Sequence, residues 1–434
     1  MIAYLTAGAG GMYCGSCMHD NTLVRAWTQM GVDAQLIPTY TPIRTDEENV
    51  SVDRVFFSGI NIYLEQLLPF YRFVPSFVRG VFDQPWLIRW AASRPSAVRP
   101  KSLGALTVSM LRGAEGKQRV EVEKLCRWLV GLQPHLVLFT NVLIAGCAQR
   151  LKAELGVPLV VTLQGDDAFL EYLTEPYRSQ AIEEIRRLVV QIDGFLVHSR
   201  YYADFMQEYL GIPPGKIHQV PLGVDVRGFP APSEATLAGM APGDRTPAAR
   251  TIGYLARLSP DKGLHLLVDA FLDLRLRSRT KGVRLRIAGW TGRDHRSYAE
   301  KQLARMEAAG LAGAFEYVGA VDRHQKLEFL RDIDVLSVPT TYRDPKGLFV
   351  LESLAAGVPV VQPRHGAFPE MLARLGGGRL VPPNDPRRLA DALESLLCDD
   401  VTRRKLGQEG ARRVHAEYNA EVMAAKTWEV LQRF

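Results

Sequence analysis

Apolar and polar residues follow a regular plan along this chain. Short apolar runs alternate with longer segments in which apolar residues recur every three or four positions. The runs predict buried strands and the longer segments predict amphipathic helices, in the strand, helix, strand order of parallel βαβ units. Strands are expected at 2–6, 136–140, 159–163, 194–198, 251–256, 283–288, 315–318, 335–338, 358–361 and 379–381. Helices are expected at about 20–30, 119–131, 143–154, 176–191, 264–274, 323–331, 348–356, 386–397, 402–417 and 420–434, and a further helix is expected to begin after Ser199 as its N-cap.

The alternating pattern occurs twice, with a break between the two halves. Residues 229–249 are rich in Pro, Gly, Ala and Asp and show no periodicity, which is typical of a linker. We therefore predict an α/β protein with two Rossmann-like, doubly wound domains. The N-terminal domain covers 1–228, the linker 229–250 and the C-terminal domain 251–415, and a last helical segment covers 416–434.

Composition and charge narrow the class of protein. With 434 residues, 47% of them hydrophobic, the chain can build two domains of ordinary size. A net charge of +6 is mild for this length and favours phosphorylated ligands or an anionic membrane surface over nucleic acid as the partner. No apolar run reaches the roughly 20 residues that span a bilayer, and the N-terminus lacks the basic region of a signal peptide. The five cysteines are odd in number and scattered except for one pair, which indicates reduced thiols, so we expect a cytoplasmic protein, with peripheral contact at the inner membrane face left open.

The most informative stretch is the polar loop and helix that follow the strand at 335–338. In a βαβ unit this loop lies at the carboxyl edge of the sheet, where ligands bind. Gly347 lets backbone approach a ligand closely, and the N–H groups at the helix start attract anions. Glu352 lies eight residues after Asp344. It either accepts two hydrogen bonds from a vicinal diol such as ribose or is a solvated residue on an exposed helix.

A second loop at the same edge follows the strand at 251–256 and carries Arg257, Lys262 and Gly263. A bound anion such as a phosphate needs a cationic partner. Arginine offers a planar fork and lysine a compact charge, here beside a helix N-terminus. The alternative is an ordinary loop with solvated charges.

Together these residues resemble glycosyltransferase family 4, the retaining glycosyltransferases of the GT-B fold. The family's E-P-F-G-L-x-x-x-E-A-x-A-x-G-x-P-V reads here Asp344-Pro345-Lys346-Gly347-Leu348, three residues, then Glu352-Ser353-Leu354-Ala355-Ala356-Gly357-Val358-Pro359-Val360. The family's R-x-x-x-x-K-G is intact from Arg257 to Gly263. Two departures, Asp344 for the first Glu and Lys346 for the usual aromatic residue, fall at the sugar-facing end of the motif.

The resemblance implies an enzyme whose two domains face each other across a cleft. The second domain would hold a nucleoside diphosphate sugar, and the first would hold an acceptor that is a glycan, a lipid or a small molecule. A hexosyl group would pass to the acceptor hydroxyl with retention of the anomeric configuration, and the departing phosphate would take the hydroxyl proton. The family needs no metal or cofactor beyond its donor, and its terminal helix, here within 416–434, crosses back onto the first domain.

The same resemblance assigns roles to individual residues. Arg257 and Lys262 would bind the diphosphate, Glu352 the ribose, and Asp344 with the backbone of Lys346, Gly347 and Leu348 the sugar. Gly289 and Val318 belong to two further carboxyl-edge positions that would contact the nucleotide. Gln164 and the glycine-rich turn with Gly10 and Gly11 would lie at the reacting centre. Gln164 replaces a histidine of many family members, and a glutamine can hydrogen-bond sugar hydroxyls but cannot carry a proton.

Several features of the first half allow two interpretations. Asp166 and Asp167 are either acceptor contacts or a helix N-cap. The Cys14-Gly15-Ser16-Cys17 run with His19 suggests a redox pair or zinc site, but no second ligand pair of suitable spacing follows, so residues lining the acceptor cleft are the preferred interpretation. Segment 60–111 interleaves aromatic residues with arginines, as in a membrane or acceptor surface, or else packs them in a core of its own.

Two other classes of function stay open. One is a nucleotide-sugar-binding protein that has lost catalysis, suggested by the departures at Gln164 and Asp344. The other is a GT-B nucleotide-sugar epimerase. Neither the base and sugar of the donor nor the acceptor is specified by the sequence.

Overall fold

The computed structural model describes residues 1–8, 14–52, 55, 100–230 and 250–434. They form two compact units, each with its own hydrophobic core. Unit 1 contains Met1–Pro221 and Met423–Phe434, and unit 2 contains Leu222–Val422. The chain therefore enters unit 2 before the expected boundary at residue 228 and returns to unit 1 for its last residues.

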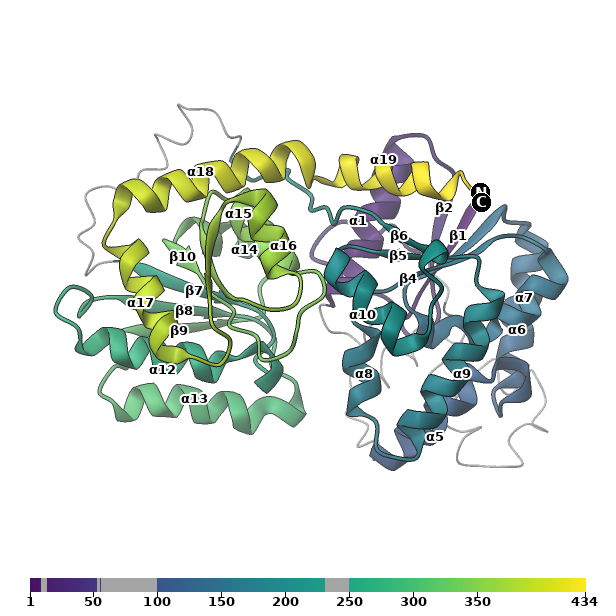
Figure 1. Ribbon diagram of the computed structural model, residues 1–434, viewed down its shortest axis with the longest axis horizontal. Helices are drawn as coiled ribbons and strands as arrows, with labels where there is room; N and C mark the ends of the chain where they lie inside the picture. Colours follow the sequence, from purple (N-terminus) through teal and green to yellow (C-terminus); the bar gives the residue numbers. More distant parts are fainter. Residues whose placement is uncertain (9–13, 53–54, 56–99, 231–249) are drawn as a thin grey trace. The chain divides into compact units, whose positions relative to one another are not determined.

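Unit 1 is built on a parallel six-stranded sheet of order β2-β1-β3-β4-β5-β6 (Figure 1). Its strands are β1 (Ile2–Thr6), β2 (Ala34–Pro38), β3 (Leu136–Phe139), β4 (Leu159–Thr162), β5 (Gly194–Val197) and β6 (Ile217–Gln219). Its helices are α1 (Gly15–Gln29), α5 (Pro100–Leu111), α6 (Arg119–Leu132), α7 (Ala148–Leu155), α8 (Asp166–Tyr172), α9 (Tyr177–Gln191) and α10 (Arg200–Leu210), with short 3₁₀ turns at Gly113–Glu115, Val142–Cys147 and Pro214–Lys216. The five residues of β1 are all buried because both faces of the sheet carry helices.

Unit 2 repeats this plan with the strand order β12-β11-β10-β7-β8-β9. Its strands are β7 (Thr251–Leu255), β8 (Arg284–Ala288), β9 (Phe315–Gly319), β10 (Val335–Leu336), β11 (Val360–Pro363) and β12 (Gly378–Val381). Its helices are α12 (Leu264–Leu276), α13 (Arg296–Ala308), α14 (Arg323–Arg331), α15 (Leu348–Ala355), α16 (Phe368–Leu375), α17 (Pro386–Leu397) and α18 (Asp400–Glu417), with 3₁₀ turns at Pro260–Lys262 and Arg293–His295. Helix α19 (Ala420–Leu431) begins in unit 2 and ends in unit 1.

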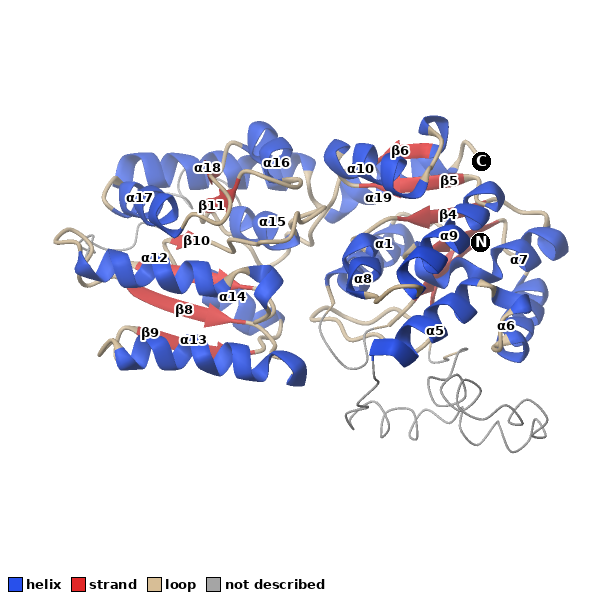
Figure 2. Cartoon of the chain, turned by 60° about the horizontal axis from the view of Figure 1, so that its bottom comes forward, coloured by secondary structure: helices blue, strands red, loops and turns tan. Residues whose placement is uncertain are grey.

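Helices cover both faces of each sheet, as Figure 2 shows, and every strand pair is parallel. The predicted pair of Rossmann-like, doubly wound domains is confirmed. In unit 2, β7 and β10 are neighbours, but α12 carries the chain from β7 toward β8 while α15 carries it from β10 toward β11. This divergence is a topological switch point, where α/β sheets bind ligands beyond the carboxyl ends of their strands.

Some element boundaries differ from those predicted. Helix α1 begins at Gly15 instead of near residue 20, because Cys14 adopts extended backbone and its carbonyl accepts the N–H of Met18 at 2.9 Å. The Cys14 to Cys17 run therefore lies in the first turn of a helix. The helix expected at 143–154 is a 3₁₀ turn followed by α7. Ser199 caps α10 as expected, accepting the N–H of Tyr202.

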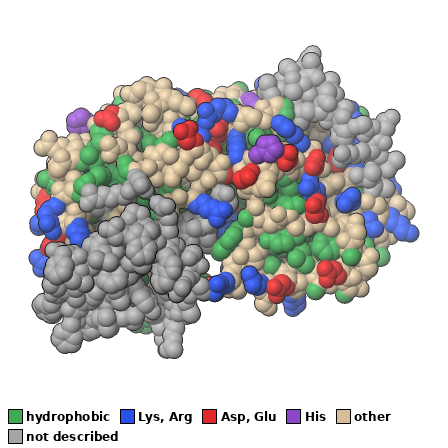
Figure 3. All heavy atoms as spheres, turned by 180° about the vertical axis from the view of Figure 1, so that it is seen from behind, with side chains coloured by type: hydrophobic (Ala, Val, Ile, Leu, Met, Phe, Trp, Pro, Cys, Tyr) green, Lys and Arg blue, Asp and Glu red, His purple; other side chains and the backbone are tan. Residues whose placement is uncertain are grey.

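The surface and the helices show two further properties. On the face drawn in Figure 3, basic and acidic side chains are interspersed among the described atoms, so the net charge is not concentrated there. Within the described ranges, no helix has both the length and the apolarity to cross a membrane.

Candidate active site

The predicted site residues of unit 2 follow four neighbouring strands. The loops after β10, β7, β8 and β9 leave the same carboxyl edge in that spatial order, because the strands are parallel and adjacent. Asp344, Lys262, Gly289 and Val318 lie in or beside these loops in the same order. Residues far apart in sequence are thus collected along one edge of one sheet.

Lys262 and Asp344 meet directly. Lys262 Nζ lies 2.7 Å from Asp344 Oδ2, and both side chains are largely buried. The two loops are also joined through backbone, since Thr341 N–H donates to the Asp261 carbonyl at 2.9 Å. At Gly263, where φ is +71°, a Cβ would lie 1.8 Å from the Pro339 carbonyl oxygen. Glycine is therefore required for the β7 loop to approach the end of β10 closely.

Asp344 organises its own loop as well. Its Oδ1 accepts the backbone N–H groups of Lys346 at 3.1 Å and Gly347 at 2.8 Å. Burial would raise the pKa of Asp344, but the charge and hydrogen bond of Lys262 and the two backbone hydrogen bonds outweigh it and lower the pKa to about 2. Gly347, with φ of +61°, caps α15, and Leu348 opens the helix with its N-terminal N–H groups.

Arg257 and Glu352 occupy different environments. Arg257 is about half exposed and contacts Asp261 at 3.3 Å. Glu352 is buried, not solvated, and its Oε1 accepts a hydrogen bond of 2.5 Å from Lys326 Nζ of α14. Sequence reasoning missed Lys326, because a lysine in a helix is normally exposed and no local pattern marks this one as buried.

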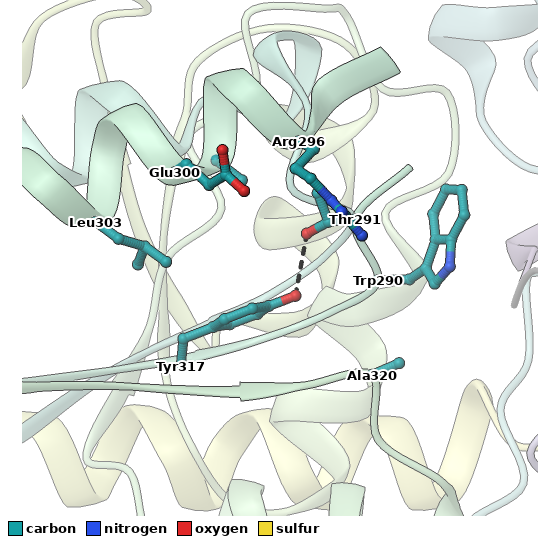
Figure 4. Close-up of a pocket in the computed structure, with 8 residues that line it drawn as sticks. Trp290, Thr291, Arg296, Glu300, Leu303, Tyr317 and Ala320 are labelled. Atoms are coloured by element: carbon teal, nitrogen blue, oxygen red, sulfur yellow. Dashed lines mark hydrogen bonds between the residues drawn. The ribbon is translucent and has the colours of Figure 1, made fainter. Parts of the chain in front are cut away.

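A pocket of about 290 Å³ opens beside the ends of β8 and β9 (Figure 4). Its wall is formed by Trp290, Thr291, Arg296, Ala299, Glu300, Leu303, Tyr317 and Ala320. Tyr317 Oη donates to the Gly289 carbonyl at 3.0 Å and lies 3.0 Å from Thr291 Oγ1. The N–H of Leu258 donates to the Trp290 carbonyl at 3.0 Å, so the pocket wall and the Arg257 loop are in direct contact.

Gln164 of unit 1 belongs to a buried network around Asp20. Its Nε2 donates to Asp20 Oδ1 at 2.9 Å and contacts Thr140 Oγ1 and the Thr140 carbonyl at 3.2 Å. Asp20 also accepts hydrogen bonds from Tyr4, Thr6 and Thr140, at 2.5 to 2.7 Å. Burial would raise the pKa of Asp20, but the hydrogen bond and charge of His19, with the hydroxyl hydrogen bonds, lower it. Asp20 thus joins the ends of β1, β3 and β4, a role that no motif in the sequence indicated.

The other predicted features of unit 1 have structural partners or lie outside the described residues. Asp166 accepts the N–H groups of Val142 at 2.7 Å and Gln164 at 2.9 Å, and burial raises its pKa to about 6 against these hydrogen bonds. Asp167 accepts from Tyr202 Oη at 2.7 Å, so both carboxylates bind protein groups. The expected N-cap role is wrong, because the N-cap of α8 is Gly165 and both aspartates lie in the first turn of the helix. A hydrogen bond with Cys14 and burial raise the pKa of the Cys17 thiol, which disfavours a reactive thiolate. Gly10, Gly11 and segment 60–99 lie outside the described residues.

Two known families match the sequence. Residues 244–413 match the family described as glycosyl transferases group 1, and residues 110–227 match glycosyltransferase family 4. A phosphatidyl-myo-inositol mannosyltransferase of Mycolicibacterium smegmatis is 32% identical over 49% of this chain and 51% of that protein. A D-inositol 3-phosphate glycosyltransferase of Segniliparus rotundus is 28% identical over 72% of this chain and 66% of that protein. The chain thus spans about half to two thirds of the length of these curated relatives.

Solved structures resemble this chain over its whole length. The sucrose-phosphate synthase of Thermosynechococcus elongatus matches with a TM-score of 0.71 and 17% identity, covering 100% of this chain and 98% of that one. The Anabaena protein HepE in complex with UDP-glucose matches with a TM-score of 0.67 and 15% identity, covering 100% of both chains. At these identities the likeness concerns the fold alone.

Proposed function

Because this chain belongs to glycosyltransferase family 4 and has the two-domain GT-B fold, we propose that it transfers a hexosyl group from a nucleoside diphosphate sugar to an acceptor hydroxyl with anomeric retention. The observation that carries the proposal is the contact between Lys262 and Asp344. Lys262 and Asp344 are 82 residues apart in the sequence. Their contact joins the R-x-x-x-x-K-G loop to the motif that runs from Asp344 to Glu352.

In the proposed reaction, the bond between the sugar C1 and the β-phosphate oxygen breaks, and C1 bonds to the acceptor oxygen on the same face. The acceptor proton passes to the departing phosphate. Lys262 and Arg257 would receive the phosphate charge, since a fixed cation in a partly buried site stabilises developing negative charge without reorganisation. Lys262 would then share its ammonium group between the phosphate and Asp344.

The order of the loops supports a donor with three parts. The loop after β10 would face the sugar, the loop after β7 the diphosphate, and the pocket at β8 and β9 the base. Three strand spacings separate β10 from β9, about 14 Å, which suits an extended nucleotide sugar. In the pocket, the rings of Trp290 and Tyr317 offer apolar surface for a base.

Purified protein incubated with GDP-mannose, UDP-glucose and UDP-N-acetylglucosamine tests the proposal. The names of the relatives recommend inositol phosphate and phosphatidylinositol as the first acceptors. We expect nucleoside diphosphate release that rises with acceptor and survives EDTA, and NMR should show a product with the donor's anomeric configuration. Binding without turnover would leave the binding-protein alternative, and a changed sugar from donor alone would indicate an epimerase.

A further inference from the structure

The buried ion pair between Lys326 and Glu352 has no role in the sequence motifs. The two side chains are only 5% and 8% exposed, and Nζ and Oε1 lie 2.5 Å apart. Lys326 comes from the first turn of α14, which is fixed by a capping box between Asp322 and Gln325. Glu352 comes from the second turn of α15. Each group is therefore held by a well-defined helix.

Such a pair needs an explanation other than stability. The free energy needed to remove two charges from water is about as large as the attraction between them. A protein with two apolar side chains of similar volume in their place is often as stable. A buried ammonium group also requires a partner, so Lys326 and Glu352 depend on each other. We therefore attribute the pair to the position that it gives to the Glu352 carboxylate and not to stability.

The geometry leaves Glu352 partly available. Among the residues that the structure describes, Lys326 is the one polar partner of the Glu352 side chain, and it contacts Oε1. An ionised carboxylate has about four acceptor positions on its two oxygens. Glu352 Oε2 can therefore accept hydrogen bonds from another group while Lys326 holds Oε1.

We propose that Lys326 is a positioning residue for the donor: it orients the Glu352 carboxylate toward the ribose diol of the nucleoside diphosphate. The inference rests on the proposed function, in which Glu352 binds the ribose. Lys326 also balances the charge of Glu352, so that the negative phosphates of the donor approach a neutral pair instead of a lone carboxylate.

Binding by calorimetry tests this role with ligands that differ only in the ribose. The ligands are GDP and UDP, their 2′,3′-dideoxy analogues and inorganic pyrophosphate. Lys326→Met keeps an unbranched chain of similar length but removes the charge, and we expect it to weaken binding of the preferred ribonucleotide tenfold or more. Binding of the dideoxy analogue and of pyrophosphate should change less than about twofold. Glu352→Gln should show the same selectivity.

The matched control is Arg331→Met, which removes an exposed cation from the same helix and should leave all three affinities unchanged. If Lys326→Met does not fold, Lys326→Gln, which keeps a hydrogen-bond donor, is used instead. The ribonucleotide should again lose more affinity than the dideoxy analogue and pyrophosphate. Equal losses for ribonucleotide and dideoxy analogue, or no loss at all, would overturn the role of Lys326. If wild-type protein binds neither nucleoside diphosphate, the proposed function itself fails, which is a separate outcome.

Discussion

Lys262 is the residue on which the proposed chemistry depends most. Its ammonium group lies 2.7 Å from Asp344, at the switch point between β7 and β10. A cation already held in place stabilises a leaving phosphate better than a mobile one, because no reorganisation is needed during reaction.

Lys262→Ala should therefore lower turnover about 10²- to 10³-fold, as loss of one preorganised group does. The measurement is nucleoside diphosphate release at saturating donor. Lys281→Ala, which removes an exposed lysine of the same unit, is the control and should turn over normally. Unchanged turnover in Lys262→Ala would show that the diphosphate is bound elsewhere.

Asp344 gives a prediction on pH. Its pKa falls from an ordinary value near 3.8 to about 2 in the folded protein, so its contribution to stability is present above about pH 4 and is lost as the pH falls toward 2. The shift corresponds to about 2 kcal/mol. Urea unfolding of wild type and Asp344→Asn should differ most at neutral pH, and the difference should shrink by about this amount at low pH. A difference that does not depend on pH would contradict the ionised, paired state.

At the scale of elements, the strands and most helices could be predicted because hydrophobic periodicity is local. Helix α14 has the predicted ends, Arg323 and Arg331. Strands β2 and β6 and helices α5, α8, α13 and α16 were not predicted from the hydrophobic pattern. Of these, α13 has just three buried residues along its length, so the periodic signal is weak.

The site could be predicted only in part, because sequence patterns report local spacing. Motif spacing identified Lys262, Asp344 and Glu352, but side-chain partners join separate elements. Gln164 bonds to Asp20, 144 residues earlier, and Glu352 to Lys326, 26 residues earlier. Neither pair leaves a periodic or local signal, so the structure was needed to show that Gln164 is bonded within a buried network.

Because the β7 loop lies close to the end of β10, we predict that alanine substitution has different effects at two glycines. Gly263 and Gly310 both have positive φ, but a Cβ at Gly263 would overlap the Pro339 carbonyl, whereas a Cβ at Gly310 meets open space. Gly310→Ala should cost about 1–2 kcal/mol of unfolding free energy for the left-handed backbone alone. Gly263→Ala should cost clearly more and also lower turnover, since it separates Lys262 from Asp344. Equal costs in urea unfolding would mean that the two loops are not in contact.

At the scale of the whole molecule, the segment Met423–Phe434 completes the first unit. The fully buried Trp27 of α1 donates its indole N–H to the Ala424 carbonyl at 2.9 Å, and Figure 1 shows α19 beside α1. The ring of Phe434 packs against Gly194, where a Cβ would lie 2.3 Å from it.

Deleting 420–434 should expose Trp27 and leave its N–H without this acceptor. We expect unit 1 to lose at least ~3 kcal/mol and the unfolding transition of unit 2 to change little. Calorimetry and tryptophan fluorescence can follow the two transitions. Glu421→Ala, at an exposed position of the same helix, should change neither, and a deletion that leaves both transitions in place would show that the segment is dispensable.

The return of the chain to unit 1 also sets an order of events during synthesis on the ribosome. Unit 1 begins to emerge first, but its Trp27 site stays uncovered until residues 423–434 have been translated, after all of unit 2. Unit 2, a continuous stretch from Leu222 to Val422, can fold as soon as it leaves the exit tunnel. Unit 1 is therefore synthesised first but completed last. Until it is complete, a chaperone can bind its uncovered Trp27 site.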